Sequence, residues 1–288
     1  MWRIIKIKGQ VFKAVASAYS VDCNGENHLC TVRKKVKNIV DIYVGDYVEI
    51  ENNIIEKVYP RKNVLIRPYV SNIDILIIMV AKVPKPDWVL VEKLLLNCYK
   101  QKITPIICIN KIDLMTDKEI EEFESPYLED VKVVKISALK CEGFDELLEL
   151  ISGNVVCFAG QSAVGKTSLC NELLGMNCEI GELSKRIERG KNTTRQIEIY
   201  RLGDAKVVDT CGFSILTAID IKYDELLYYY QDYIKLSVDC KYPNCTHTTE
   251  PNCGVRKAVE SGIINKDRYD RYVTLYKELK ENWRKKYE

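Results

Sequence analysis

Residues 160–168 carry the pattern of a phosphate-binding loop, between an apolar run at 155–159 and a stretch expected to be helical. In such loops the glycines let backbone N–H groups turn inward around a phosphate chain. Lys166 would add positive charge against the outer phosphates, and the Thr167 hydroxyl would bind Mg²⁺. A glycine-rich turn with an exposed lysine is the alternative interpretation. The predicted phosphate contacts are Gly160, Gln161, Ser162, Ala163, Val164, Gly165, Lys166, Thr167 and Ser168.

A tetrad suited to recognising guanine lies upstream, at residues 110–113, after the expected strand 105–109. The carboxylate of Asp113 can accept hydrogen bonds from the ring N–H and the amino group of guanine, whereas adenine presents the opposite polarity. Together with the phosphate loop, the tetrad favours GTP over ATP. The next expected strand ends at Ser137-Ala138, where a backbone N–H can meet the guanine carbonyl. The predicted base-binding residues are Asn110, Lys111, Asp113, Ser137 and Ala138.

Two polar segments after the phosphate loop are candidates for sensing the terminal phosphate. In the segment 209–212, Asp209 can hold the water shell of Mg²⁺ and the Gly212 N–H can meet the γ-phosphate. In the segment 190–194, Thr193 or Thr194 can complete the Mg²⁺ shell when the γ-phosphate is present, and we favour Thr194. The expected Mg²⁺ ligands are Thr167, Thr194 and Asp209, and the expected catalytic residues are Lys166, Thr194 and Gly212.

No histidine is left to act as a base at this site. Of the two histidines, His28 belongs to the N-terminal part and His247 to a cysteine cluster. Phe213 follows Gly212, where Ras-like proteins carry the glutamine that orients the attacking water. Because phosphoryl transfer depends mainly on positioning and charge, slow hydrolysis is still expected. Fast turnover should require an outside partner that completes the site.

Three of the 12 cysteines lie close to His247, in the spacing Cys-x4-Cys-x-His-x5-Cys. Three thiolates and one imidazole within a short loop fit a closed tetrahedral zinc site. Such a site is structural, because no coordination position remains open for a substrate. Chance proximity in a cysteine-rich chain is the alternative. We predict one structural Zn²⁺ held by Cys240, Cys245, His247 and Cys253.

The nucleotide motifs require a scaffold that brings strand ends together. Residues 69–220 alternate apolar strands with helices, which predicts an α/β domain with a doubly wound, mostly parallel sheet. Ligands of such sheets bind outside the carboxyl ends of the strands. The guanine tetrad precedes the phosphate loop, the reverse of ordinary GTPases, so we interpret the domain as circularly permuted. The segment after Asp209 then leads directly into the C-terminal part, which a γ-phosphate-dependent loop could move.

The two flanking parts differ from this centre. Residues 1–68 predict five short strands with turns at Gly9, Asn24-Gly25 and Gly45-Asp46, which fits an OB-like β-barrel, although an SH3-like barrel gives the same pattern. This part has 12 Lys and Arg against 7 Asp and Glu. That excess of positive charge is equally compatible with an RNA-binding face and with a plain solvated face. Residues 221–288 predict a helical zinc-binding domain that ends in a long basic helix.

Several classes of protein are excluded by composition. The longest apolar run, Ile75–Ala81, is too short to span a bilayer, so no membrane association is expected. The N-terminus has internal charges and no cleavage site, so no signal peptide is predicted. Many unpaired cysteines without an export signal are typical of the reducing cytoplasm.

In the order and spacing of these motifs the chain resembles the RsgA (YjeQ) family of GTPases that depend on the small ribosomal subunit. The resemblance covers essentially the whole chain and rests on segments 110–113, 160–167 and 209–213 and on the cysteine–histidine loop. It implies a cytoplasmic factor that binds GTP or GDP, the maturing 30S subunit and its 16S rRNA. It also implies late action in small-subunit maturation, hydrolysis stimulated by the subunit, and a monomeric state.

Two positions depart from the family pattern. Such families usually carry a histidine, proposed to help hydrolysis, where this chain has Asn192. Asparagine can hold a water but takes up no proton near neutral pH, so Asn192 is a candidate catalytic residue without a base's function. Cys211 stands where proline is common. The alternative function is a GTP-switched RNA-binding scaffold with negligible hydrolysis, since Phe213 and Asn192 both activate water poorly. The barrel and the zinc loop disfavour a GTPase of large-subunit assembly.

Overall fold

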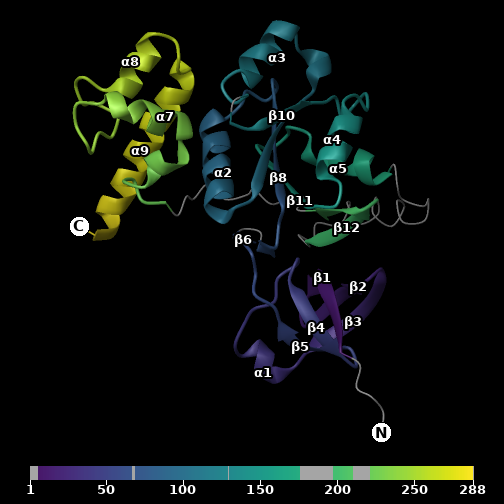
Figure 1. The fold of residues 1–288 in the computed structure, drawn as a ribbon. Coiled ribbons are helices and arrows are strands. Elements are labelled where there is room, and N and C mark those ends of the chain that lie inside the picture. Colours follow the sequence, from purple (N-terminus) through teal and green to yellow (C-terminus); the bar gives the residue numbers. More distant parts are fainter. Residues whose placement is uncertain (1–5, 67–68, 129, 176–196, 210–220, 288) are drawn as a thin grey trace.

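The chain forms three units (Figure 1): an N-terminal β-barrel, a central sheet covered by helices, and a helical C-terminal unit beside α2 (Trp88–Gln101). This arrangement confirms the predicted multidomain fold. None of the helices in the described part is long and apolar enough to cross a membrane. The computed structural model describes residues 6–66, 69–128, 130–175, 197–209 and 221–287.

The N-terminal unit is a closed barrel. Its strands follow the order β1-β2-β3-β5-β4, and β4 returns to pair with β1. The contact between β3 and β5 is parallel, and the other contacts are antiparallel. This closed five-stranded order fits the OB-like prediction. A short helix between β3 and β4 was not predicted. The elements are β1 (Ile7–Val15), β2 (Ala18–Cys23), β3 (Glu26–Val32), α1 (Lys34–Lys37), β4 (Tyr47–Glu51) and β5 (Ile54–Val58).

Two glycines of the barrel show where local patterns do and do not predict structure. Asn24 and Gly25 have φ of 54° and 100° and form the two-residue hairpin turn between β2 and β3, as expected. The predicted turn at Gly9 is wrong, because this residue lies inside β1. A Cβ on Gly9 would lie 2.5 Å from both Cys23 Sγ and Val21 Cγ1. Gly9 therefore allows β1 and β2 to pack closely and does not interrupt the strand.

The central sheet has the strand order β10-β9-β8-β11-β13-β12, in which only β12 is antiparallel to its neighbour. Helices cover both faces, which confirms the doubly wound prediction (Figure 1). The elements are β8 (Ile75–Ala81), β9 (Thr104–Asn110), α3 (Asp117–Glu124), β10 (Lys132–Lys135), α4 (Phe144–Ile151), β11 (Val155–Gly160), α5 (Lys166–Gly175), β12 (Glu198–Leu202) and β13 (Ala205–Asp209).

Strand β8 is buried along its whole length because alternate side chains enter two different cores. Leu76 and Ile78 pack in the cluster that contains the apolar side of α2. Ile77 and Met79 pack in the cluster that contains α4 and α5. The continuous apolar run in the sequence thus belongs to a central strand with helices on each side.

The barrel and the central sheet are joined by strand pairing and by polar contacts. Lys13 of β1 pairs with Glu198 of β12, and their side chains form a 2.7 Å ion pair. Arg201 forms a 2.5 Å ion pair with Asp22, which is nearly buried. A two-stranded ribbon of β6 (Val64–Leu65) and β7 (Val70–Ser71) connects the two units.

The C-terminal unit has its own core, formed around α9. The sequence predicts a stripe of core residues at helical spacing along this helix, formed by Tyr269, Tyr272, Leu275, Tyr276 and Leu279. All are buried except Tyr269, which is partly buried against the same core. The predicted division points 68/69 and 220/221 adjoin residues outside the described part. The elements are η2 (Leu226–Tyr229), α7 (Gln231–Leu236), η3 (Ser237–Asp239), α8 (Gly254–Glu260) and α9 (Lys266–Tyr287).

A buried carboxylate links α2 to this C-terminal unit. Glu92 is 2% exposed and accepts hydrogen bonds from Tyr127 Oη (3.0 Å) and Tyr230 Oη (3.2 Å). Arg271 Nε of α9 lies 3.2 Å from the same carboxylate. Burial is the main reason why the pKa of each tyrosine is raised, so both hydroxyls stay protonated as donors. One α2 side chain thus satisfies donors from three segments that are distant in sequence.

Replacing Glu92 by alanine is expected to weaken the attachment of the C-terminal unit. The change leaves a buried guanidinium and two buried hydroxyls without their acceptor, and breaking such a pair typically costs about 3–5 kcal/mol. Urea unfolding followed by far-UV circular dichroism measures the loss. Glu278→Ala is the control, because Glu278 pairs with Lys93 at the same interface with a 41% exposed side chain. It should cost less than about 1 kcal/mol. Equal losses in both variants would contradict the prediction.

Candidate functional site

The guanine tetrad, the phosphate loop and Asp209, which are the described parts of the predicted nucleotide motifs, converge at one edge of the central sheet. Strands β8, β9, β10, β11 and β13 are parallel, so their carboxyl ends meet at this edge. Asn110 ends β9 beside Ala81, and Gly160 ends β11 beside Met79. Val208 lies beside Cys157, which places Asp209 at the same edge next to the phosphate loop. Although the guanine tetrad precedes the phosphate loop in the sequence, the parallel strands bring both motifs to the same edge of the sheet.

At two positions between β11 and α5, neighbouring atoms lie so close to the backbone that only glycine fits. Gly160 has a φ of 133°, and a Cβ there would lie 2.3 Å from the Met79 carbonyl oxygen. Gly165 has a φ of 101°, and its Cβ would lie 2.3 Å from Asn110 Nδ2. The loop is thus pressed against β8 and against the first residue of the guanine tetrad. A side chain at position 160 would push the loop away from β8, and one at position 165 would push it away from Asn110.

Lys166 lies in the first turn of α5 and reaches back across the loop. Its Nζ donates hydrogen bonds to the carbonyl oxygens of Gly160 (2.8 Å) and Gln161 (2.7 Å). At the start of α5, Leu169 N donates a hydrogen bond to Gly165 O (2.9 Å). The earlier N–H groups of an α-helix have no intrahelical acceptor and point out of its N-terminus. A lysine ammonium and a helix N-terminus therefore face the same loop, an arrangement suited to phosphate.

Asn110 connects the tetrad to the other two motifs. This side chain is 1% exposed, and its Nδ2 donates to the Val164 carbonyl in the phosphate loop (2.9 Å). Its Oδ1 accepts from the backbone N–H groups of Lys111 (2.8 Å) and Ala138 (3.0 Å). One buried amide thus fixes the spacing between the phosphate loop, the tetrad and the loop after β10. The sequence pattern identified Asn110, but not these partners 28 and 54 positions away.

The two charged residues of the tetrad are also held in place. Lys111 has a φ of 63°, and its Nζ donates to the carbonyl oxygens of Val83 (2.8 Å) and Ala163 (2.9 Å). Asp113 lies in η1 (Ile112–Leu114) and accepts a 2.6 Å hydrogen bond from Ser137 Oγ. The hydrogen bond from Ser137 fixes the orientation of the Asp113 carboxylate. In this orientation the carboxylate is suited to accept hydrogen bonds from the two neighbouring donors on the guanine edge. The Ala138 N–H is already donated to Asn110, so donating it to a base requires an exchange of partners.

A contact that sequence reasoning missed joins the phosphate loop to α2. Gln161 Oε1 accepts a hydrogen bond from the Asp87 N–H (3.1 Å), and Asp87 in turn caps α2 through Leu90 N (2.9 Å). No local pattern signals this pairing, because the partners are 74 positions apart. Through α2, the loop is connected to the buried Glu92 and hence to the C-terminal unit.

The residues expected at Mg²⁺ are only partly described. Thr167 is exposed at the start of α5, and Asp209 ends β13 opposite Glu198. Thr167 lies on the helix that follows the loop, and Asp209 ends β13, the strand that pairs with β11 before the loop. An oxygen donor set of this kind fits a hard cation. Thr194, Asn192, Gly212 and Phe213 lie outside the described residues, so the predictions made for them remain predictions.

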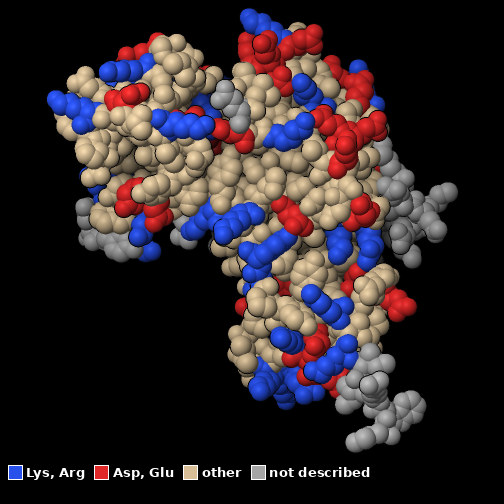
Figure 2. Space-filling view, in the orientation of Figure 1, with Lys and Arg blue, Asp and Glu red and all other residues tan. Residues whose placement is uncertain are grey.

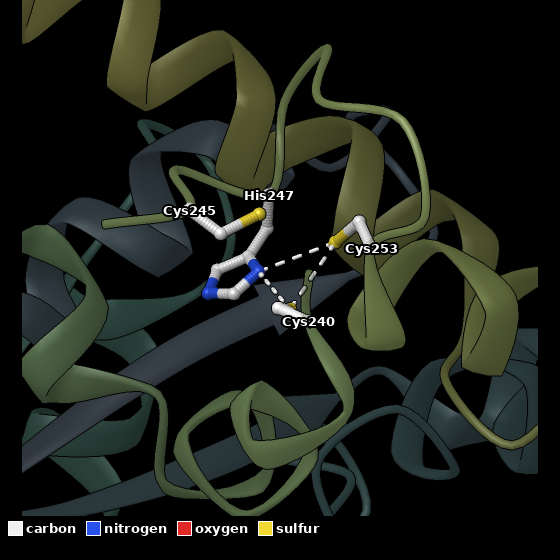
Figure 3. A group of neighbouring side chains, drawn as sticks. All are labelled: Cys240, Cys245, His247 and Cys253. Atoms are coloured by element: carbon white, nitrogen blue, oxygen red, sulfur yellow. Dashed lines mark hydrogen bonds between the residues drawn. The ribbon is translucent and has the colours of Figure 1, made fainter. Parts of the chain in front are cut away.

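The four predicted zinc ligands come together in the C-terminal unit (Figure 3). Cys240 Sγ and Cys253 Sγ are 3.9 Å apart, and His247 Nδ1 lies 3.5 Å from the first and 3.3 Å from the second. With Zn–S near 2.3 Å and Zn–N near 2.0 Å, a tetrahedron has edges of about 3.8 Å and 3.5 Å. Cys245 completes the group, in which all ligand atoms lie within 4.8 Å. The residues therefore fit one tetrahedral zinc ion.

Neighbouring groups set the orientation and the protonation state of these residues as metal binding requires. His247 is fully buried, and its Nε2 lies 3.2 Å from Ser237 Oγ, which leaves Nδ1 for coordination. Burial lowers the pKa of His247, so the imidazole is neutral, as a ligand must be. The Gly254 N–H points at Cys240 Sγ (3.2 Å), and such a donor favours thiolate.

Glu250 organises the loop between the ligands. Its carboxylate accepts hydrogen bonds from Thr246 N (2.9 Å) and Oγ1 (2.6 Å), and from the N–H groups of Thr248 and Thr249 (both 3.1 Å). Burial by itself raises the pKa of Glu250, but these hydrogen bonds outweigh it and lower the pKa to about 2. The loop is thus held in shape by an ionised side chain that is not a ligand.

The fold and these motifs together define a circularly permuted GTPase-type domain, preceded by a barrel and followed by a cysteine–histidine metal centre. A family model described as RsgA GTPase matches residues 58–219. The chain belongs to the RsgA GTPase family.

Relatives over the whole length support this assignment. A protein of Caldanaerobacter subterraneus subsp. tengcongensis named small ribosomal subunit biogenesis GTPase RsgA is 37% identical, covering 98% of this chain and 99% of the relative. The namesake from Alkaliphilus metalliredigens is 36% identical over 96% of this chain and 99% of its own. The crystal structure of YjeQ from Thermotoga maritima superposes with a TM-score of 0.80 at 32% identity, over 96% of this chain and 99% of that one. YloQ, described as a circularly permuted GTPase, gives 0.76 at 28% identity, over 96% of each chain.

Proposed function

We propose that the chain binds and hydrolyses GTP and acts in the late maturation of the small ribosomal subunit, which stimulates its turnover. The observation that carries the GTP assignment is the Asn110 side chain, which joins the phosphate loop, the tetrad and the Ser137-Ala138 loop into one unit. The subunit assignment is supported by the names of the relatives, which are biogenesis GTPases of that subunit. We further propose a monomeric protein that works in the cytoplasm.

Within this site we assign a role to each group. Lys166, the N–H groups of the loop and the start of α5 bind the phosphates, and Asp113 selects guanine. Thr167, Asp209 and Thr194 would hold Mg²⁺, which would supply positive charge to the phosphates. The Gly212 N–H would meet the γ-phosphate. Because no residue of the site is a strong base, hydrolysis depends on positioned charge and is slow until the subunit fixes the loops.

We assign GTP to residues 69–220, RNA contact to residues 1–68 and the zinc ion to residues 221–288. The barrel of residues 1–68 carries a net charge of +5, from 12 Lys and Arg against 7 Asp and Glu. Figure 2 shows basic side chains spread over the barrel and its junction with the rest of the molecule. Such a surface is suited to the phosphates of 16S rRNA.

Steady-state GTP turnover with and without purified small subunits tests the proposal. Stimulation by small subunits, and none by large subunits, is the expected result. Lys166→Ala should abolish turnover, because the phosphates lose their principal cation. Binding to the subunit in the GTP form without any stimulated turnover would instead favour the GTP-switched RNA-binding scaffold. Absence of both binding and stimulation would refute the role in subunit maturation.

A further inference from the structure

Where the barrel meets the central sheet, two tyrosines and an arginine form a stack. The rings of Tyr43 and Tyr69 are nearly parallel, with 17° between their planes and 4.9 Å between their centroids. The guanidinium carbon of Arg61 lies 4.1 Å from the centroid of the Tyr43 ring. Tyr69 is 49% exposed, whereas Tyr43 is half-buried. The stack therefore begins inside the junction and ends on an aromatic ring at the surface.

The inner end of this stack is fixed by a fully buried carboxylate. Asp46 is 0% exposed and binds Arg61 through both oxygens, at 2.7 Å to Nε and 2.8 Å to Nη2. It also accepts hydrogen bonds from the Tyr43 N–H (2.8 Å) and from Ser71 Oγ (2.6 Å). Such a bidentate pair holds the guanidinium in one orientation. The stack is thus preorganised, and its outer ring needs little ordering when a flat ligand binds.

Basic and aromatic side chains also lie at the end of β5, in the segment that leads to Arg61. Lys57 lies near the end of β5 and Tyr59 follows that strand, while Glu49 of β4 pairs in register with both Lys57 and Lys8. The Nζ atoms of Lys57 and Lys8 lie 4.9 and 5.0 Å from the centroid of the Tyr59 ring. A flat exposed ring and exposed lysines suit unpaired RNA, in which a base stacks on the ring while phosphates meet the lysines.

We propose that Tyr69 is a stacking platform for an unpaired base of RNA, with Lys8 and Lys57 meeting the neighbouring phosphates. The inference rests on the proposed role in small-subunit maturation, and it names the residues at which the barrel side of the chain holds RNA. An acidic peptide would also pair with the lysines, but its carboxylates do not stack on an aromatic ring. The preorganised ring stack therefore favours RNA. Base–aromatic stacking is tolerant of sequence, so the contact anchors RNA without selecting a motif.

Anisotropy of a fluorescein-labelled, ten-nucleotide, single-stranded RNA of mixed sequence tests the platform in the full-length chain. Tyr69→Ala is expected to weaken binding by about 5- to 150-fold, the usual range for one stacked base. Tyr69→Leu should be equally weak, because leucine packs on Tyr43 without offering a flat face, whereas Tyr69→Phe should bind like the wild type. Tyr228→Ala is the matched control, since Tyr228 is 68% exposed in the C-terminal unit. GDP affinity, measured in parallel, should stay within twofold in every variant and so reports intact folding.

Three results would overturn the platform. These are unchanged RNA binding by Tyr69→Ala, an equal loss in Tyr228→Ala, and a wild-type chain that does not bind the oligonucleotide. A loss of small-subunit binding in Tyr69→Ala with unchanged oligonucleotide binding would also overturn it, because the contact would then be with protein. Stimulation of wild-type turnover by small subunits is measured separately. If it persists while the platform fails, the proposed function stands.

Discussion

Replacing Cys253 by serine is expected to abolish stable zinc binding and to unfold much of the C-terminal unit. Cys253 Sγ lies 3.9 Å from Cys240 Sγ and 3.3 Å from His247 Nδ1, the spacing expected between ligands of one zinc ion. Loss of an outer-shell partner alone weakens metal affinity by about 10- to 100-fold, and loss of a ligand should exceed this range. Because structural zinc sites supply folding energy outright, the loop and α8 should lose their order with the metal.

Serine is an informative replacement at this position. Cys253 is also the N-cap of α8, where its side chain accepts from the Arg256 N–H. Serine is itself a favoured N-cap residue, so the substitution removes the thiolate while keeping the cap. Any loss of order is then attributable to the metal. The zinc content per chain, from atomic absorption, and the rate of limited proteolysis after residue 221 measure the two effects.

Cys141→Ser is the control for this experiment, because Cys141 is an exposed thiol of the central unit. It should retain one zinc ion per chain and the wild-type protease resistance. GDP affinity should change less than threefold in Cys253→Ser, since the nucleotide residues lie on a different unit. One zinc ion per chain and unchanged resistance in that variant would show that the ligand set is wrong.

The sequence predicted helices well where their ends are signalled locally. The sequence predicts a helix over residues 88–101, and α2 has these bounds, with Asp87 capping its start and Lys102 in the left-handed region (φ 56°) ending it. Helix α3 begins with a complete capping box between Thr116 and Glu119. These signals lie within a few residues of the ends they determine. They are therefore visible before any tertiary contact is known.

The side-chain contacts that escaped sequence reasoning depend on distant partners. Glycine is typical of turns, so Gly9 indicated one. Its place inside β1 is explained by the side chains of Val21 and Cys23, which leave no room for a Cβ. Glu92 lies within an apolar helical stretch, and its acceptor role emerges only when α9 packs alongside with Arg271. A lone carboxylate in such a stretch could have signalled a buried polar network. Its partners could not have been named from the sequence.

The metal centre and the nucleotide motifs were predictable for a different reason. Both are defined by residue types at short spacings, and the chemistry of zinc or phosphate restricts those types strongly. The zinc quartet spans 240–253 and needed no knowledge of the fold. The nucleotide site required one further step, the convergence of parallel strands at their carboxyl ends. The sheet order supports that step, because β9 and β11 flank β8.

Replacing Asp113 by asparagine is expected to convert a guanine preference into a xanthine preference. The carboxylate can accept from both donors on the guanine edge, whereas the amide presents one donor and one acceptor. Each mismatched buried polar group costs about 1–3 kcal/mol, so GDP affinity should fall by about 100-fold or more. Xanthine carries a carbonyl where guanine has its amino group, and the new amide donor can pair with it. Xanthosine diphosphate should therefore bind the variant better than GDP does.

Asp117→Asn is the matched control for this change, because it makes the same substitution at an exposed residue in the first turn of α3. Competition of GDP, xanthosine diphosphate and ADP against fluorescent GDP measures the preference of each variant. The 2.6 Å bond from Ser137 to Asp113 gives a second check. Ser137→Ala frees the carboxylate to rotate, so it should weaken GDP binding several-fold while keeping the guanine preference. If Asp113→Asn still preferred GDP to xanthosine diphosphate, the base would have to bind elsewhere, and the convergence of tetrad and loop around Asn110 would serve only the fold.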